Sequence, residues 1–272
     1  MRIAFVGGGH MTTSLVGGLR ERGAAPADLF VADPSPKQLE RLQFDFGVRC
    51  STDNVETVRA ADLVVLAVKP QDMAAAARSI AGELGLRRRT VVSVAAGIRL
   101  AQLAQWLGAG VPVVRTMPNR PALIGAGITG AVAGVGVTHE ECAAVERVLS
   151  AVGPLVWLDD ESLMDAVTAV SGSGPAYFFL LIEALEDAGT ALGLPPATAR
   201  HLAVHTALGA GRMVTESTES PATLRGQVTS KGGTTAAALD VLERADMRGI
   251  FAAAIAAAAR RSAELADQYG GK

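Results

Sequence analysis

The segment FVGGGHMTTSL, residues 5–15, joins a short apolar run to a helical run through three consecutive glycines. Its spacing matches the dinucleotide-binding fingerprint G-x-G-x-x-G at Gly7 and Gly9, but Thr12 stands at the third glycine position. In that fingerprint the first glycine permits a tight turn and the second lets the backbone approach a pyrophosphate, whereas the third mainly allows close packing of the helix on the strand. We therefore expect the turn to bind a dinucleotide despite Thr12. A glycine-rich turn without a ligand is the alternative.

Apolar runs alternate with helical runs through the first 160 residues. Each apolar run is nearly continuous, as expected for strands that are covered on both faces. Strands and helices in alternation indicate a parallel, doubly wound sheet, so the predicted fold class of this half is a Rossmann-type α/β domain. The predicted strands cover residues 2–7, 28–33, 61–70, 90–97 and 111–118, with further strands at the sheet edge within 125–134 and 153–158.

The second part of the chain contains no strand-like run. It predicts an all-α C-terminal domain, and we place the boundary near residue 160, which gives domains of residues 1–160 and 161–272. The segment SGSGP, residues 171–175, is expected to interrupt the first of the helices. The later helices are predicted at residues 176–194, 196–217, 234–245 and 247–270.

The composition argues against several classes of protein. The 272-residue chain has a net charge of −2 and 4% aromatic residues, which gives no case for binding nucleic acid or an anionic membrane. Its longest uncharged apolar run, residues 251–259, is far shorter than the roughly 20 residues that span a bilayer, and no secretory signal is recognisable. Two distant cysteines, Cys50 and Cys142, favour a reducing cytoplasm. His201 and His205 are one helical turn apart, but no further ligand is evident, so we predict no metal site.

Asp33 ends the second predicted strand, where an acidic residue of this fold accepts hydrogen bonds from an adenosine ribose. A carboxylate at this position repels a 2′-phosphate and favours NADH. Ser35, Lys37 and Arg41 follow it and offer a phosphate a donor and two positive charges, which favours NADPH. The choice of cofactor therefore stays open, and a helix N-cap is the alternative role for Asp33.

Two segments rich in small residues interrupt the helical part. AVSGSGPAY, residues 169–177, places glycines inside an apolar helical run, at a cost of roughly 1 kcal/mol each, either to admit a ligand to the backbone or to form a helix joint. VTSKGGTT, residues 228–235, precedes a helix and combines glycines with hydroxyl groups, which is typical of a carboxylate-binding nest or of an ordinary capped loop. No Ser-His-Asp or Cys-His arrangement is recognisable. A reductase that transfers hydride to an already polarised group needs little else.

These segments together resemble the pyrroline-5-carboxylate reductase family over essentially the whole chain. The resemblance runs through FVGGGHM, LAVKP, SVAAG, RTMPNRPA, DAVTAVSGSGPAYFFLLIEAL and VTSKGGTT, in the order and spacing of the family. It implies reduction of 1-pyrroline-5-carboxylate to L-proline, with hydride passing from nicotinamide C4 of NADPH or NADH to the imine carbon. It also implies a homodimer with interlocked helical domains and active sites built from both chains, and an assembly of five dimers in a ring.

The resemblance also assigns residues to the site. For the cofactor it implies Gly7, Gly9, His10 and Met11 at the pyrophosphate, Asp33, Ser35 and Asn54 at the adenosine half, Ala67, Val68, Lys69, Pro70, Ala95, Ala96 and Gly97 beside the dinucleotide, and Asn119 near the nicotinamide. For the substrate it implies Ser230, Gly232, Gly233, Thr234 and Thr235 at the carboxylate, and Glu161 nearby. Thr235 is the expected catalytic residue, donating a hydrogen bond to the ring nitrogen.

The chain departs from the family pattern at several positions. His10 replaces an asparagine, Thr12 a glycine or alanine, Arg120 a threonine and Lys231 a proline, while Arg225-Gly226 replaces Lys-Asp. Arg120 and Lys231 add positive charge beside predicted ligand positions, so the departures either reflect drift or alter the choice of substrate. A related cyclic-imine reductase and a non-catalytic sensor of NAD(P) or proline are the alternative functions.

Overall fold

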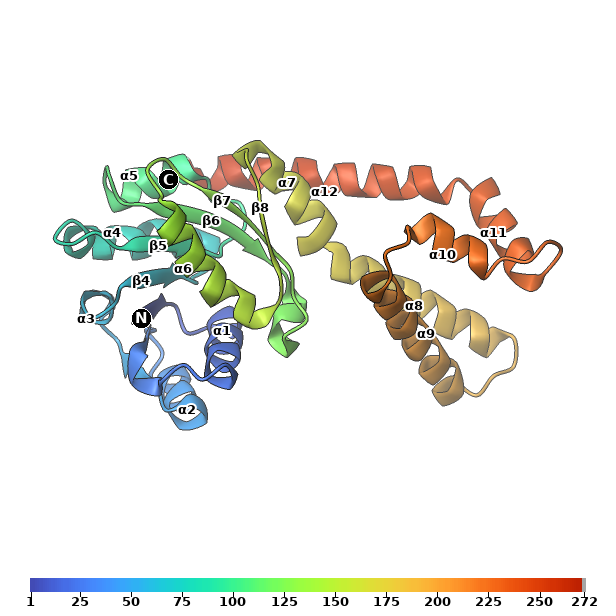
Figure 1. Cartoon of the computed structure of the whole chain (residues 1–272), viewed down its shortest axis with the longest axis horizontal. Coiled ribbons are helices and arrows are strands. Elements are labelled where there is room, and N and C mark those ends of the chain that lie inside the picture. The colour runs from blue at the N-terminus through green and yellow to red at the C-terminus, as the bar shows by residue number, and fades with distance from the viewer. Residues whose placement is uncertain (271–272) are drawn as a thin grey trace. The chain divides into compact units, whose positions relative to one another are not determined.

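The computed structural model describes residues 1–270, and these form two compact units (Figure 1). The first, called the sheet unit, comprises Met1–Ser173 together with the chain from Ala257 on. The second, called the helical unit, is Gly174–Ala256. The domain boundary expected near residue 160 stays a prediction.

An eight-stranded sheet forms the centre of the sheet unit, in the order β3-β2-β1-β4-β5-β6-β7-β8. The pairs from β3 to β6 are parallel, β7 is antiparallel to β6, and β8 is parallel to β7. This confirms the predicted doubly wound α/β fold. The strands are β1 (Ile3–Val6), β2 (Leu29–Ala32), β3 (Arg49–Ser51), β4 (Leu63–Leu66), β5 (Thr90–Ser93), β6 (Val113–Pro118), β7 (Thr129–Ala133) and β8 (Leu155–Trp157).

Successive residues of the central strands enter two different apolar cores, one on each face of the sheet. In β1, Phe5 belongs to one core, whereas Ala4 and Val6 belong to the other. This explains the continuous apolar runs in the sequence, because each residue is buried whichever way it points. Edge strand β3 was not predicted, since its three residues are polar or only partly buried. Its pairing with β2 is a tertiary contact that the local pattern does not reveal.

Helices connect the strands of the sheet unit. Local signals fix their ends; for example, Ser35 caps α2, Pro36 occupies its first turn, and Gly47 closes it in the left-handed conformation at φ 70°. The α-helices are α1 (His10–Glu21), α2 (Pro36–Phe46), α3 (Asn54–Arg59), α4 (Met73–Leu84), α5 (Leu100–Leu107), α6 (His139–Leu149) and α7 (Met164–Val167). Short 3₁₀ turns are η1 (Pro26–Asp28), η2 (Pro70–Asp72), η3 (Arg120–Ile124), η4 (Ser150–Val152) and η5 (Glu161–Leu163).

The SGSGP segment does not break the helix as expected. Residues Thr168–Gly172 form a π-helical turn, in which the Ser173 N–H donates to the Thr168 carbonyl at 2.8 Å, and α8 starts at Gly174. Gly172 packs closely, because a Cβ at this position would lie 2.5 Å from Cε of Met117. The small residues therefore widen the helix and admit a neighbouring side chain while the chain stays helical, as in the π-bulges found at many functional sites.

The helical unit contains α8 (Gly174–Ala191), α9 (Pro196–Glu216), α10 (Pro221–Gln227), α11 (Thr234–Arg244) and the first part of α12 (Met247–Gly270). The short helix α10 was not predicted; Ser220 caps it by accepting from the Thr223 N–H at 3.1 Å. Only Gly174, Ala199 and Ala203 of this unit are buried, whereas Phe178 and Phe179 are more than 60% exposed. The helical unit therefore has no hydrophobic core of its own within the chain.

The helical stretch Glu161–Ala191 is long and apolar enough to cross a membrane by length and composition, and 11% of its apolar window is buried. A helix that lies in an apolar protein interface passes the same test, so these two criteria do not assign it to a bilayer. The expectation that the chain binds no membrane stays a prediction.

Candidate active site

Gly7 lies at the carboxyl end of β1, next to the end of β4, which is the point where the strand order reverses. Parallel sheets of this kind bind ligands at that switch point. Gly7 has φ 100°, and a Cβ there would lie 2.7 Å from the carbonyl oxygen of Ala67 and 3.0 Å from Val68 Cγ1. Only glycine fits, and the two expected cofactor segments at Gly7 and at Ala67–Val68 are indeed neighbours.

Gly9 caps α1 without a side-chain hydrogen bond, and no acidic residue lies in the first turn of the helix. The first N–H groups of a helix have no intrahelical partner and carry the positive end of its dipole, which suits a phosphate. His10 and Met11 begin this helix, and the His10 side chain is exposed. The arrangement fits the pyrophosphate role expected for these residues.

Thr12 is fully buried, and its hydroxyl donates to the Gly7 carbonyl at 2.5 Å. The threonine at the third fingerprint position therefore fastens the helix to the glycine turn. Its side chain is enclosed between the helix and the turn, so threonine fits the packing position that the fingerprint gives to a glycine.

Asp33 follows β2, and both of its carboxylate oxygens accept hydrogen bonds from the backbone. Oδ2 accepts from the Gly8 N–H at 2.7 Å, and Oδ1 accepts from the Ser35 N–H at 2.9 Å. The N-cap of α2 is Ser35, so the alternative N-cap role of Asp33 is wrong. Gln38 adds a third link, because its Nε2 donates to the Gly8 carbonyl at 2.5 Å. The carboxylate thus joins the glycine turn to the start of α2.

A shallow hollow of about 420 Å³ lies beside this junction. Ser35, Lys37, Gln38 and Arg41 are among its lining residues, and Arg41 has only an exposed ion pair with Asp45 at 3.5 Å. Lys37 and Arg41 therefore line the same hollow as Ser35, whose N–H binds the Asp33 carboxylate, and the hollow also includes the acidic Glu40. The alternatives that the sequence left open are both represented in the structure.

Two further expected cofactor residues lie at the starts of helices that follow the strands. Asn54 begins α3, and its Nδ2 donates to Ser79 Oγ at 3.1 Å. Lys69 is exposed and precedes Pro70 in the 3₁₀ turn after β4. The exposed ammonium group of Lys69 is available to a phosphate. The roles of Lys69 and Asn54 at the dinucleotide stay predictions.

Asn119, at the end of β6, is 9% exposed and uses both ends of its amide within the protein. Nδ2 donates to the Ser171 carbonyl at 3.2 Å, and Oδ1 accepts from the Ile128 N–H at 2.9 Å. The side chain thus ties the π-helical turn to the sheet. Arg120, the unusual neighbour, is exposed.

Glu161 contacts groups of the sheet unit. Its Oε1 accepts from Nη1 of the buried Arg115 at 2.7 Å and from the Leu100 N–H, the first of α5, at 2.8 Å. The carboxylate therefore neutralises a buried cation and satisfies a helix end. Its expected place near the substrate stays a prediction.

The SKGGTT segment of the helical unit forms a turn before α11. Gly232 has φ 74°, and Gly233 caps the helix without a side-chain hydrogen bond. A Cβ on Gly233 would lie 2.5 Å from Ser230 Oγ, so the hydroxyl rests directly on the cap. Thr234 and Thr235 form the first turn, which contains no acidic residue. The Gly233 N–H donates to the Ser230 carbonyl at 3.0 Å, whereas the first N–H groups of the helix have no intrahelical partner, which suits an anion such as a carboxylate. The role of this segment at the substrate stays a prediction.

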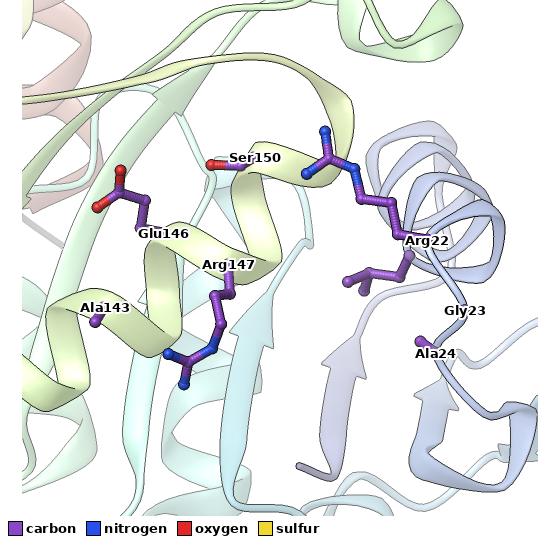
Figure 2. A pocket seen from close by; sticks show the side chains of 8 residues that line it. Arg22, Gly23, Ala24, Ala143, Glu146, Arg147 and Ser150 are labelled. Carbon is purple, nitrogen blue, oxygen red and sulfur yellow. The ribbon is translucent and has the colours of Figure 1, made fainter.

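Features elsewhere do not add to this site. A hollow of about 720 Å³ between the end of α1 and α6 is lined by Arg22, Arg147 and Ser150, but by none of the expected site residues (Figure 2). The rings of His201 and His205 lie 4.4 Å apart, and the described residues contain no group of three or more metal-ligating side chains. Gln38 was missed, because nothing in the sequence links it to a glycine 30 positions away.

Comparison with known proteins gives a consistent result. Residues 161–265 match the family described as pyrroline-5-carboxylate reductase dimerisation, and residues 2–97 match NADP oxidoreductase, coenzyme F420-dependent. The chain is 48% identical to a pyrroline-5-carboxylate reductase of Pseudomonas aeruginosa, over 99% of this chain and 98% of that one.

Two solved structures cover nearly the whole chain. That of a pyrroline-5-carboxylate reductase from Coxiella burnetii is 39% identical, with a TM-score of 0.94 and coverage of 97% of this chain and 98% of that one. That of Plasmodium falciparum pyrroline carboxylate reductase with NADP bound is 28% identical, with a TM-score of 0.85 and coverage of 98% of both chains. From the full-length identity and the shared fold, the chain belongs to the pyrroline-5-carboxylate reductase family.

Proposed function

We propose that this protein reduces 1-pyrroline-5-carboxylate to L-proline, the last step of proline biosynthesis, with NADPH or NADH as the hydride donor. The proposal rests on one observation: a chain of this family contains two helix starts without side-chain caps, one at Gly9 and one at Gly233. One suits a pyrophosphate and the other a carboxylate. A dinucleotide and a small imino acid are the ligands that need such sites.

The residues of the glycine turn fit the cofactor. Gly7 permits the close approach of the turn to Ala67, where a Cβ would collide with the carbonyl oxygen, and Thr12 holds the turn against α1. When bound, the nicotinamide supplies the hydride for the imine carbon. NADP is bound in the related Plasmodium falciparum structure, and here Ser35, Lys37 and Arg41 offer groups for its additional phosphate. Asp33 keeps NADH as the alternative cofactor.

The substrate demands little chemistry from the protein. Ser230 and the backbone of Gly232, Gly233 and Thr234 would hold the carboxylate, with Glu161 nearby, and the Thr235 hydroxyl would donate a hydrogen bond to the ring nitrogen. The imine carbon becomes a good hydride acceptor when the ring nitrogen takes a proton from that hydroxyl or from water. Orientation of two bound reactants can lower the barrier by ~7–11 kcal/mol, so positioning is the main contribution expected of the enzyme.

The proposal extends to the assembly. The match to a dimerisation family and the apolar side chains exposed on the helical unit support a homodimer. We infer that its helical domains interlock, that both chains build each active site, and that five dimers form a ring. Its mass in solution tests the ring. A cytoplasmic location is part of the proposal and accords with two free cysteines.

The test is oxidation of NADPH and of NADH with pyrroline-5-carboxylate as substrate. We expect turnover with at least one cofactor and much slower turnover with the six-membered piperideine carboxylate. Faster turnover of the larger or of a more acidic imine would instead indicate that Arg120 and Lys231 alter the substrate choice. Binding of NADPH without oxidation in the presence of any of these imines would contradict the proposal and favour a sensor.

A further inference from the structure

The carboxyl-terminal end of α12 is part of the sheet unit, where it lies against the start of α5 (Figure 1). Its inward side chains are fully enclosed: Ala266 is 1% exposed, and Ser262 is 5% exposed. The Ser262 hydroxyl donates to Asp165 Oδ1 at 2.6 Å, which fastens the helix to α7. One face of this helix end is thus buried in the sheet unit.

The same helix end touches the loop after β5 at Gly97. This residue has φ 73°, and the position of a Cβ there is 3.5 Å from the Tyr269 ring and 3.6 Å from the Ala266 nitrogen. A methyl group at Gly97 would therefore be in ordinary van der Waals contact with α12, so the loop runs directly beside this helix. Tyr269 also packs against the core on that face of the sheet.

Gln102 links the two segments through hydrogen bonds. Its Nε2 donates to the Ala266 carbonyl at 3.1 Å, and its Oε1 accepts from the Arg99 N–H at 2.8 Å. One side chain therefore joins the end of the loop, the first turn of α5 and the last turns of α12. Arg99 and Asp267 add an ion pair at 2.8 Å, but both side chains are exposed, so solvent weakens it.

The first half of the loop is held by the sheet, because the Val94 N–H donates to the Leu66 carbonyl at 3.1 Å and Ala95 is buried in the core, but its side chains offer no polar contact of their own. Its residues Val94, Ala95, Ala96 and Gly97 carry small side chains without polar groups, and one of them is a glycine with positive φ. Ordering such a backbone costs conformational entropy, which contacts with neighbouring segments must offset. Glu161 binds the Leu100 N–H at the same end of the loop as Gln102, whereas the end of α12 lies beside its centre at Gly97.

We infer that the carboxyl-terminal end of α12 positions the loop of Ala95–Gly97 for the dinucleotide, and that Tyr269 and Gln102 are the positioning residues. The inference rests on the proposed function only in taking this loop as a cofactor contact. The end of α12 would then contribute to the affinity for the cofactor, although it lies more than 160 residues beyond the loop in the sequence.

The test uses the full-length protein with Tyr269→Ala, with Gln102→Ala and with both changes. Gln268→Ala is the matched control, because this side chain is exposed on the same turn of α12. Two quantities are measured: the Kd for NADPH by fluorescence titration, and hydrogen exchange at the amides of residues 95–100 in the protein without cofactor.

We expect each single change to raise the Kd about tenfold, the scale of one hydrogen bond or one aromatic contact. The double change should raise it further, with faster exchange at residues 95–100, while the KM for pyrroline-5-carboxylate and the oligomeric state stay as they are. The control should change none of these.

An unchanged Kd in the double variant, or an equal rise in Gln268→Ala, would overturn the inference. A wild-type protein that binds neither NADPH nor NADH would overturn the proposed function instead. In that case hydrogen exchange decides the present inference, and unchanged protection at residues 95–100 in the double variant contradicts it.

Discussion

The two units of the chain differ in how far they bury their apolar side chains. In the sheet unit, strands such as β1 and β4 are buried along their entire length, with an apolar core on each face of the sheet. In the helical unit, α8 exposes consecutive large side chains at Phe178, Phe179 and Leu180, each more than 60% accessible. The sheet unit is complete within one chain, whereas the helical unit requires a surface that the single chain does not supply.

This difference bears on how the two halves of the proposed site depend on assembly. The glycine turn at Gly7 belongs to the unit with its own cores, so its geometry does not depend on a second chain. The carboxylate nest before α11 belongs to the unit without a core. Cofactor binding should therefore survive loss of the dimer, and turnover should not.

The largest effect is expected from Phe178→Asp combined with Phe179→Asp. Full burial of each phenylalanine contributes roughly 1.5–3 kcal/mol, a symmetric interface counts each change twice, and a buried charge costs several kcal/mol more. We expect monomers in solution and turnover reduced at least about 100-fold, with the Kd for NADPH within about twofold. Light scattering, steady-state rates and fluorescence titration measure these.

The matched control for that change is Val135→Asp, at a fully exposed side chain of the sheet unit. It should leave the mass, the rate and the affinity unchanged. A double aspartate variant that stays dimeric and active would show that α8 does not form the interface, and the contrast between the two units would lose its meaning.

Next in size is Thr235→Ala. Removing a proton or hydrogen-bond donor at the reacting nitrogen typically costs 10²–10⁴-fold, so we expect kcat to fall about 100-fold. The affinity for NADPH should stay nearly unchanged, since the cofactor residues lie in the other unit. Thr234→Ala, one position earlier in α11, is the control and should retain most of the turnover, because only the backbone of Thr234 is proposed to hold the carboxylate and the change leaves that backbone in place. Equal rates for Thr235→Ala and wild type would remove Thr235 from the catalytic role.

Gly7→Ala tests the self-contained unit. The added Cβ would lie 2.7 Å from the Ala67 carbonyl oxygen in a backbone with φ 100°, which is strained for any other residue. We expect a loss of about 1–3 kcal/mol in stability of the sheet unit and at least a tenfold rise in the Kd for NADPH. Thermal unfolding and titration measure the two quantities. The dimer should persist, because its apolar surface lies in the helical unit.

Gly9→Ala provides the comparison for Gly7→Ala, since no atom lies within 4 Å of a Cβ at Gly9. Its stability should change little, while its affinity falls if the pyrophosphate approaches the backbone there. Equal destabilisation by both changes would contradict the account of Gly7.

Much of this architecture was predictable because its determinants are local. The continuous apolar runs gave the central strands, Ser35 and Gly47 mark the ends of α2, and Gly233 marks the start of α11. Edge strand β3 was missed because it consists of polar residues, and helix α10 was missed because it has only seven residues. The π-helical turn was mistaken for a break, because its stability depends on the packing of Met117 on Gly172, which lies outside the local sequence.

The candidate site divides in the same way. Residues of the glycine turn follow from a short motif, whereas the fastening of that turn by Thr12, Asp33 and Gln38 follows from contacts over 5 to 30 residues. Glu161 and Asn119 show the limit of assigning residues by motif. Their side chains hold Arg115 and Ser171 in this structure, so a motif position near a site does not say whether the residue meets the ligand or its neighbours.

The smallest effect is expected at the surface of the sheet unit. Partial burial raises the pKa of Glu141, but hydrogen bonds from Arg88 and from the Thr138 backbone outweigh it and hold that pKa below its ordinary value. Because the folded pKa is depressed, the carboxylate stabilises the protein above its ordinary pKa. This contribution is lost as the pH falls through the folded value.

Glu141→Gln should therefore lower Tm by only about 2 °C at pH 7, since the arginine of this ion pair is half exposed to solvent, which weakens the pair. The difference from wild type should shrink as the pH falls through the depressed pKa of the folded state. Glu140→Gln is the control. Glu140 lies in the same first turn of α6, whereas the ion pair with Arg88 is made by Glu141, so the control measures the contribution of the helix dipole by itself. Thermal scans across this pH range measure both variants. If Glu141→Gln lowered Tm at pH 7 as much as Gly7→Ala does, the stability of the sheet unit would depend on surface contacts and not on its two apolar cores.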